Sequence, residues 1–312
     1  MAEKIATREA YGKALVEFAD KYDYVVLDAD LAEATKTVIF KKACPDRFFD
    51  CGIAEGNMIT VAAGLAAAGK VAFASSFAMF AAGRAYEQVR NSVGYPHLNV
   101  KIGATHAGIT VGEDGATHQC LEDLALMRTI PGMVVINPAD AIEARAAVEC
   151  AINTYGPFYM RFGRAAVPVI NDNPDYKFEL GRGVLLRDGK DVTIVATGIM
   201  VSMALEAAEA LAAEGIDARV INIHTIKPID REIIAAAAKA TGAIVTAEEH
   251  NVIGGLGSAV SEVVCEECPV PVVKVGVNDS FGRSGKVQPL LDLYGLTPAN
   301  IVANAKKAIS LK

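Results

Sequence analysis

The chain has 312 residues, a formal net charge of −7, and 52% apolar against 21% charged residues. This length suffices for two domains with substantial cores, and the composition is typical of a globular protein. The acidic balance gives no basic field for nucleic acid or an anionic membrane, and no apolar run reaches the roughly 18 residues of a membrane span. Six scattered cysteines and a polar first segment favour a cytoplasmic location.

Strand-like and helix-like segments alternate along the chain, which predicts an α/β protein with two parallel-sheet-based domains. In the first domain we expect helices over residues 5–21, 55–69 and about 77–93, and strands over residues 24–28, 70–74, 98–102, 133–136 and 158–162. Asn137-Pro138-Ala139-Asp140 has the composition of a helix start.

A segment rich in Pro, Asn, Asp and Gly divides the chain. We therefore place the first domain at residues 1–167, a linker at 168–188 and the second domain at 189–312. The second domain should be a smaller βαβ series with a mixed sheet. Its expected strands are 192–196, 218–222, 243–246 and 272–275, with a helix near 200–214.

Glu55 opens an Ala-rich helix in the stretch Asp50-Cys51-Gly52-Ile53-Ala54-Glu55-Gly56-Asn57-Met58. An acid in a helix's first turn is ordinary, because it complements the positive end of the macrodipole. The small residues around it, however, leave room for a planar ring to approach the backbone. Phe77, Met79 and Phe80 follow one strand later and are able to stack on such a ring, although core packing is the better explanation for Phe77 alone.

A Gly-rich loop holds His106, Glu113, Asp114 and His118 after a predicted strand end, where parallel sheets bind ligands. The spacing matches no metal-ligand pair, so we expect no metal there and favour hydrogen bonds to a polyhydroxylated, phosphorylated substrate.

Arg8, Arg161 and Arg164 are candidate phosphate ligands, because a guanidinium offers phosphate two parallel donors. Taken individually, each is better explained by a surface ion pair, but Arg161 and Arg164 stand at the end of a predicted strand, which favours a ligand-binding role. Gly254-Gly255-Leu256-Gly257 raises a dinucleotide-binding alternative, but Val260 stands at the third glycine position. We interpret this run as a tight strand-to-helix connection, with His250 before it in a core or an interface.

These residues together resemble the C-terminal half of transketolase, over nearly the whole chain. Gly112-Glu113-Asp114-Gly115-Ala116-Thr117-His118-Gln119 is close to that family's Gly-Glu-Asp-Gly-Pro-Thr-His-Gln, with Ala116 in place of proline. The resemblance implies a pyrimidine-binding domain followed by a transketolase C-terminal domain. It implies an enzyme that uses thiamine diphosphate to move a two-carbon ketol unit from a ketose phosphate to an aldose phosphate, as in the pentose phosphate pathway.

The resemblance also implies roles for individual residues. Glu55 matches the glutamate that pairs with the cofactor's pyrimidine N1′ and favours its reactive tautomer. Phe80 matches the ring stacked on the pyrimidine, with Phe77 nearby, and Asp30 and Leu31 match positions that face the cofactor. His118 and Asp114 align with residues that contact the hydroxyl groups of the donor sugar, and we expect His118 to be catalytic. Arg8 and His106 align with substrate-phosphate contacts, together with Arg164 by ungapped counting or Arg161.

The family's phosphate-binding serine falls on Ala34, and its tyrosine three places after the stacking phenylalanine is Gly83. The sequence also shows no Gly-Asp-Gly run to hold the diphosphate and its metal. We therefore expect an N-terminal subunit to bind the diphosphate and Mg²⁺, with two copies of each chain in the assembly.

Two alternatives stay open. The beta subunit of a 2-oxo acid dehydrogenase needs the same glutamate, and Arg84-Ala85-Tyr86-Glu87-Gln88 leans towards that group and 1-deoxy-D-xylulose-5-phosphate synthase. A non-catalytic subunit that only completes a partner's interface is the other. A nicotinamide dehydrogenase is disfavoured by the incomplete glycine fingerprint.

Overall fold

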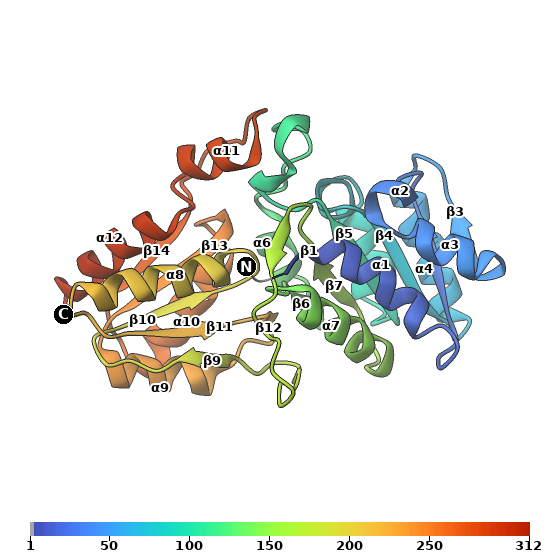
Figure 1. Cartoon of the computed structure of the whole chain (residues 1–312). Helices are drawn as coiled ribbons and strands as arrows, with labels where there is room; N and C mark the ends of the chain where they lie inside the picture. The colour runs from blue at the N-terminus through green and yellow to red at the C-terminus, as the bar shows by residue number, and fades with distance from the viewer. Residues whose placement is uncertain (1–2) are drawn as a thin grey trace.

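Two mostly parallel sheets organise the chain, and Figure 1 shows them side by side, the first in blue to green and the second in yellow to red. The computed structural model describes residues 3–312. The predicted fold class, two α/β domains on largely parallel sheets, is confirmed. Among the described residues, no helix combines the length and apolar character needed to cross a bilayer.

The first sheet has seven strands in the order β12-β6-β7-β5-β4-β2-β3, all parallel except β12. Its strands are β2 (Tyr24–Asp28), β3 (Phe48–Asp50), β4 (Val71–Phe77), β5 (Val100–Thr105), β6 (Val134–Ile136), β7 (Phe158–Arg161) and β12 (Thr225–Lys227). The helical segments around it are α1 (Thr7–Glu17), α2 (Ala32–Thr35), α3 (Val38–Ala43), η1 (Pro45–Arg47), α4 (Glu55–Ala67), η2 (Met79–Arg84), α5 (Tyr86–Gln88), η3 (Val89–Gly94), η4 (Ile109–Asp114), α6 (Asp123–Arg128) and α7 (Ala141–Asn153).

Strand β2 shows why this sheet is buried on both faces. All five of its residues are buried, and the first four alternate between two apolar cores. Tyr24 and Val26 pack with α1 and α7, whereas Val25 and Leu27 pack with α4. Such continuous apolar strands are expected where helices cover both sides of a parallel sheet.

The second sheet has the order β14-β13-β10-β11-β9, with β9 antiparallel, which confirms the expected mixed sheet. Its elements are β9 (Val184–Arg187), β10 (Val192–Ala196), α8 (Met200–Ala213), β11 (Ala218–Asn222), α9 (Arg231–Thr241), β13 (Ile244–Asn251), α10 (Leu256–Glu267), β14 (Val272–Val277), α11 (Val287–Leu293) and α12 (Pro298–Ile309). Helix starts follow local chemistry, since the side chains of Asp140, Asp230 and Thr297 each cap a helix N-terminus.

The two domains interlock more than the linear pattern suggests. Strand β12 comes from the second half of the chain but pairs antiparallel with β6 in the first sheet. Residues 5 and 6, expected to begin a helix, instead lie in β1 (Lys4–Ala6), which pairs with β8 (Ala166–Pro168). Backbone pairing with distant residues outweighs local helix propensity there. We retain the boundaries at residues 167 and 189 as a proposal.

The helix expected over about residues 77–93 is also corrected. Phe77 ends strand β4, and the chain then forms the π-helical segments η2 and η3, joined by the short helix α5. The wider π turn moves residues around the helix axis and is frequent at functional sites. It brings Phe80 and Arg84 to the same end of the first sheet as Glu55.

Lys101 is a fully buried lysine on β5 with no carboxylate partner among the described residues. Its Nζ donates to the carbonyl oxygens of Thr154 and Gly156, both at 2.7 Å, and lies 4.1 Å from the centre of the Phe158 ring. Burial lowers the pKa of Lys101 from 10.5 to about 7.

We therefore expect the free energy of unfolding to rise with pH. The pKa of Lys101 is about 7 when folded and 10.5 when unfolded, so the unfolded chain binds the extra proton between these values. The contribution is up to about 1.4 kcal/mol per pH unit. Urea unfolding at pH 7, 8 and 9 should show this slope, and it should be smaller in Lys101→Met. The exposed control Lys70→Met should keep it; equal slopes in all three proteins would contradict the assignment.

Candidate active site at the carboxyl end of the first sheet

The carboxyl ends of parallel strands place the candidate site. Loops that follow β2, β3, β4 and β5 carry most of the residues singled out in the sequence. Because these strands are parallel neighbours, their following loops meet at one edge of the sheet.

Glu55 is the first residue of α4 and is only 2% exposed. Its Oε2 has no hydrogen-bond partner within residues 3–312, and Arg84 Nη1 lies 3.6 Å away. A buried carboxylate normally requires hydrogen bonds, and each missing one costs free energy. The helix N-terminus offsets part of that cost. The geometry fits a ligand that brings its own hydrogen-bond partner to this oxygen.

Four aromatic rings form a cluster, and one of them, Phe80, contacts Arg84. Phe77 stacks on Phe80 with centroids 5.7 Å apart and on His106 at 3.8 Å. His118 meets Phe80 edge to face at 5.3 Å, and the Arg84 guanidinium lies 5.5 Å from the Phe80 centroid. Phe80 is half-buried, so part of its ring is accessible to a planar ligand.

Arg8 and His106 are joined directly. Arg8 Nη1 lies 3.1 Å from His106 Nε2 and donates to the carbonyl of Ala34 at 2.7 Å. Burial first, and then the charges of Arg8 and Arg164, lower the pKa of His106 to about 3, so its ring is neutral at pH 7. Since arginine only donates, Nε2 is the acceptor and the Nδ1 proton faces Thr105 Oγ1 at 2.9 Å. His106 therefore orients Arg8 instead of adding a charge.

Arg8 and Arg164 make this corner electropositive. The pKa of Arg8 is lowered by burial and then by the charge of Arg164, which shows that the two cations are neighbours. Lys36 adds a third cation, because its charge is among the smaller causes that lower the pKa of His106. No ion pair joins any of the three to a carboxylate within the described part of the chain. Adjacent unpaired cations suit a polyanionic group such as phosphate.

Asp28 supports the neighbouring loop. Its carboxylate accepts hydrogen bonds from Leu31 N at 2.6 Å, Thr35 Oγ1 at 2.7 Å and Thr37 Oγ1 at 2.8 Å. Burial raises the pKa of Asp28 to about 6. The loop it holds presents Asp30, which is exposed and has φ 59°, and the half-buried Leu31.

Asp114 and His118 lie on the signature loop. Asp114 is exposed at the end of η4, and His118 is half-buried, with its Nδ1 2.9 Å from Thr117 Oγ1. This contact leaves Nε2 of His118 for a ligand. No hydrogen bond or ion pair within residues 3–312 joins the Asp30 or Asp114 side chain to the ring cluster.

Arg161 has a different position from that expected of a phosphate ligand. Its side chain is 3% exposed, and its Nε donates to Asp123 Oδ2 at 2.8 Å. Its Nη2 donates to the Glu249 carbonyl at 2.9 Å, and Asp123 also accepts from Tyr159 at 2.8 Å. The bond to Glu249 connects the two domains, and the correction leaves Arg164 as the arginine close to Arg8.

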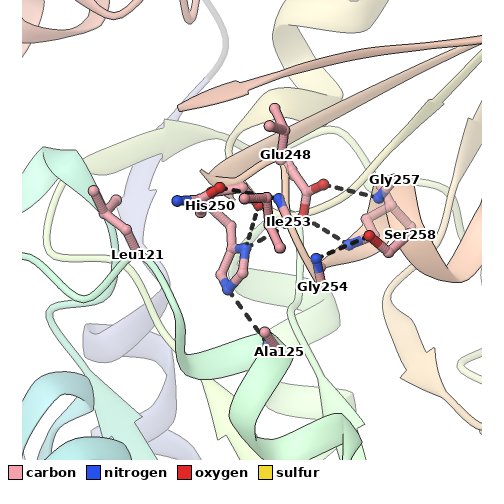
Figure 2. Close-up of polar contacts among 12 residues, drawn as sticks. Leu121, Ala125, Glu248, His250, Ile253, Gly254, Gly257 and Ser258 are labelled. Atoms are coloured by element: carbon pink, nitrogen blue, oxygen red, sulfur yellow. Dashed lines mark hydrogen bonds and ion pairs between the residues drawn. The ribbon is translucent and has the colours of Figure 1, made fainter. Parts of the chain in front are cut away.

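The glycine-rich turn at residues 254–257 is closed by a carboxylate of its own chain (Figure 2). Glu248 is fully buried and accepts from Leu256 N at 2.6 Å and Gly257 N at 2.8 Å. These are the helix N–H groups that a dinucleotide phosphate would need. A Cβ on Gly255 would lie 2.0 Å from Glu248 Oε2. The turn is therefore the tight connection expected from the sequence.

A pocket of about 660 Å³ opens beside the rings, between the two domains. Phe80 and Arg84 form part of its wall, opposite the second-domain segment Asp279–Gly282. Sequence reasoning missed Asp28, Lys36 and Arg84 as site residues. Their only signals were a strand-end aspartate, a lysine two places after Ala34, and an arginine four places after Phe80.

Two family models match nearly the whole chain. The model described as transketolase, pyrimidine binding domain, matches residues 3–169, and that described as transketolase, C-terminal domain, matches residues 181–301. The chain belongs to the transketolase family. The resemblance inferred from the signature loop is therefore confirmed.

Several transketolases are similar along the full length of this chain. A protein of Methanocaldococcus jannaschii, provisionally described as a transketolase C-terminal section, is 51% identical over 94% of this chain and 93% of its own. The 6-deoxy-6-sulfo-D-fructose transketolase subunit SqwH of a Clostridium species is 48% identical over 98% and 95%. Human transketolase is 39% identical, and this chain spans 50% of its length.

Solved transketolase structures give the same fold. A split gene transketolase, described as an inactive beta4 tetramer, superposes with a TM-score of 0.92 at 60% identity and 99% coverage of both chains. Transketolase from Leishmania mexicana superposes with a TM-score of 0.82 at 25% identity, over 99% of this chain and 46% of that one.

Substitution of the two arginines should have different effects on the stability of this chain. Arg161→Met should lower the free energy of unfolding by about 3–5 kcal/mol, because Asp123 would stay buried without its partner. Arg164→Met removes one hydrogen bond, from Nη1 to the Val111 carbonyl at 2.5 Å, and should cost about 1 kcal/mol. Denaturant unfolding followed by circular dichroism measures both. Equal losses would contradict the structural role given to Arg161.

Proposed function

We propose that this chain is the C-terminal subunit of a two-chain transketolase. In this proposal it transfers a two-carbon ketol unit from a ketose phosphate to an aldose phosphate. The observation that carries the proposal is the buried carboxylate of Glu55, whose Oε2 accepts no hydrogen bond from residues 3–312, together with the Phe77 and Phe80 rings and a group of cations that form no ion pair within those residues. The carboxylate suits a ring nitrogen, the aromatic rings suit a heterocycle, and the cations suit a phosphate.

Thiamine diphosphate, when bound, supplies the nucleophilic carbon for this transfer. Glu55 would hold a proton at the pyrimidine N1′, and Phe80 would stack on the ring with Phe77 behind it. Asp30 and Leu31 would also face the cofactor. The fit rests on the free Oε2 of Glu55 and on the accessible face of Phe80.

The substrate would lie along the cations. Arg8, oriented by His106, and Arg164 would bind the phosphate, with Lys36 beside them in place of the family's serine at position 34. His118 would donate or accept a proton through Nε2 at the donor hydroxyls, with Asp114 as a further contact. Related subunits are named for 6-deoxy-6-sulfo-D-fructose and for apulose 4-phosphate, which supports a sugar substrate that differs among such proteins.

A second subunit would complete the site. We propose that an N-terminal transketolase chain holds the diphosphate and Mg²⁺, with two copies of each chain in the assembly. The similar split-gene chain, described as an inactive tetramer of beta chains, supports an active site that needs a second kind of subunit.

The isolated chain should therefore show no ketol transfer. Adding the N-terminal subunit, thiamine diphosphate and Mg²⁺ should restore transfer from xylulose 5-phosphate to ribose 5-phosphate, measured by the aldose phosphate released. The N-terminal subunit alone is the control. Full activity in the isolated chain would reject the shared site, and lipoyl-dependent turnover would favour the 2-oxo acid dehydrogenase alternative.

Glu55→Gln tests the proposed acid. In the two-chain enzyme it should lower turnover at least about 100-fold, because the amide cannot supply the proton. The isolated variant should unfold no more easily than the parent, since the change removes a buried charge and loses only the 3.6 Å contact with the exposed Arg84. Glu209→Gln, an exposed change of the same kind on α8, is the matched control. If Glu55→Gln keeps the parental turnover, the alternative of a non-catalytic partner subunit would be favoured.

A further inference from the structure

The second domain holds the loop that carries the candidate substrate residues. Residues 106–119, here called the substrate loop, contain His106, Asp114 and His118. They follow β5 at the carboxyl end of the first sheet. Three contacts with the second domain fix this loop. Figure 1 shows α11 beside the η4 region, consistent with the close packing of these two elements.

The first contact comes from Glu249 on β13. Its side chain is 3% exposed, and its Oε1 accepts the Thr110 N–H at 2.6 Å. Gly108 lies directly against the same carboxylate, because a Cβ at that position would come within 2.3 Å of the carboxyl carbon. Gly108 also has φ +82°, a conformation that favours glycine. The start of the substrate loop is thus seated on Glu249.

The other two contacts hold the end of the loop. Gln119 Nε2 donates to the carbonyls of Ile109 and Gly112, both at 3.2 Å, and to Arg283 of the second domain at 3.0 Å. Ser284 Oγ donates to the Glu113 carbonyl at 2.6 Å. The donors in these bonds are a side-chain amide and a hydroxyl, whereas Glu249 contributes a carboxyl oxygen as acceptor.

Glu249 is itself held between the domains. Arg161 Nη2 donates to its backbone carbonyl at 2.9 Å, while Arg161 Nε binds Asp123. The charge of Arg161 also opposes the effect of burial, which raises the pKa of Glu249. The buried pair therefore keeps the Glu249 carboxylate at a fixed place beneath Gly108 and Thr110.

We infer that Glu249 is a positioning residue for the substrate loop, and that holding this loop is a function of the second domain. The inference rests on the proposed ketol transfer for its kinetic consequence. Displacement of Gly108 would move His106, two residues earlier, and with it the orientation of Arg8. A small misplacement of binding groups is enough to cause a large loss of rate.

Glu248 gives a matched control from the same strand. It is equally buried, but its carboxylate caps helix α10 and makes no hydrogen bond to the substrate loop within residues 3–312 (Figure 2). Alanine at either position removes a buried acceptor. Comparing the two variants therefore distinguishes a general loss of stability from a displacement of the substrate loop.

The kinetic experiment uses the reconstituted two-chain enzyme. Glu249→Ala should lower kcat/KM for a ketose phosphate by about 10- to 100-fold, mainly through KM. The loss should be smaller for hydroxypyruvate, a donor without phosphate. Glu249→Gln keeps one acceptor oxygen and should fall between parent and alanine variant. Glu248→Ala should keep nearly parental kinetics wherever it remains folded.

Hydrogen exchange of the isolated chain gives a second, activity-independent measurement. Glu249→Ala should speed exchange of the amides of residues 108–119, and Glu248→Ala those at the start of α10. Parental loop exchange in Glu249→Ala, or kinetics no different from Glu248→Ala, would overturn the inference. If the parental complex itself transfers no ketol unit, the proposed function fails while hydrogen exchange still tests Glu249.

Discussion

The buried carboxylate of Glu55 is the constraint on which the candidate site depends. A helix N-terminus stabilises its charge, but its Oε2 lacks a hydrogen bond from the described residues and only Arg84 lies near. Such an arrangement costs folding free energy and is characteristic of functional positions. The π-helical turn after β4 has the same character, because it gives up regular helical geometry and brings Phe80 and Arg84 to this edge of the sheet.

The site also separates its charges. Glu55 lies at one end beside the rings, and Arg8, Arg164 and Lys36 gather at the other, where His106 is held neutral. A neutral imidazole serves this corner because it orients Arg8 through its lone pair without adding positive charge. One end is thereby suited to a proton-bearing heterocycle and the other to an anion. The ring cluster of Phe77, Phe80 and His118 lies close to both.

Buried charged residues also connect the two domains. Asp123, Arg161 and Glu249 form an interior network that crosses the domain boundary, and β12 adds a strand from the second half to the first sheet. Removing either partner of a buried pair is far more costly than removing a surface pair. The two domains are consequently linked by backbone pairing and by charge, which suits a loop that must keep several substrate ligands in register.

The sequence by itself determined the α/β class, most strands, the family and the set of candidate residues. Local patterns suffice for these, because strand alternation, the Asp140 helix cap and the signature loop at residues 112–119 are local properties. Tertiary structure decided the antiparallel additions of β1 and β12, the π-helical break after Phe77, and the different surroundings of Arg161 and Arg164. These depend on which distant groups meet. Two arginines three residues apart have the same local chemistry, and only the packed fold gives one a buried aspartate and the other a neighbouring cation.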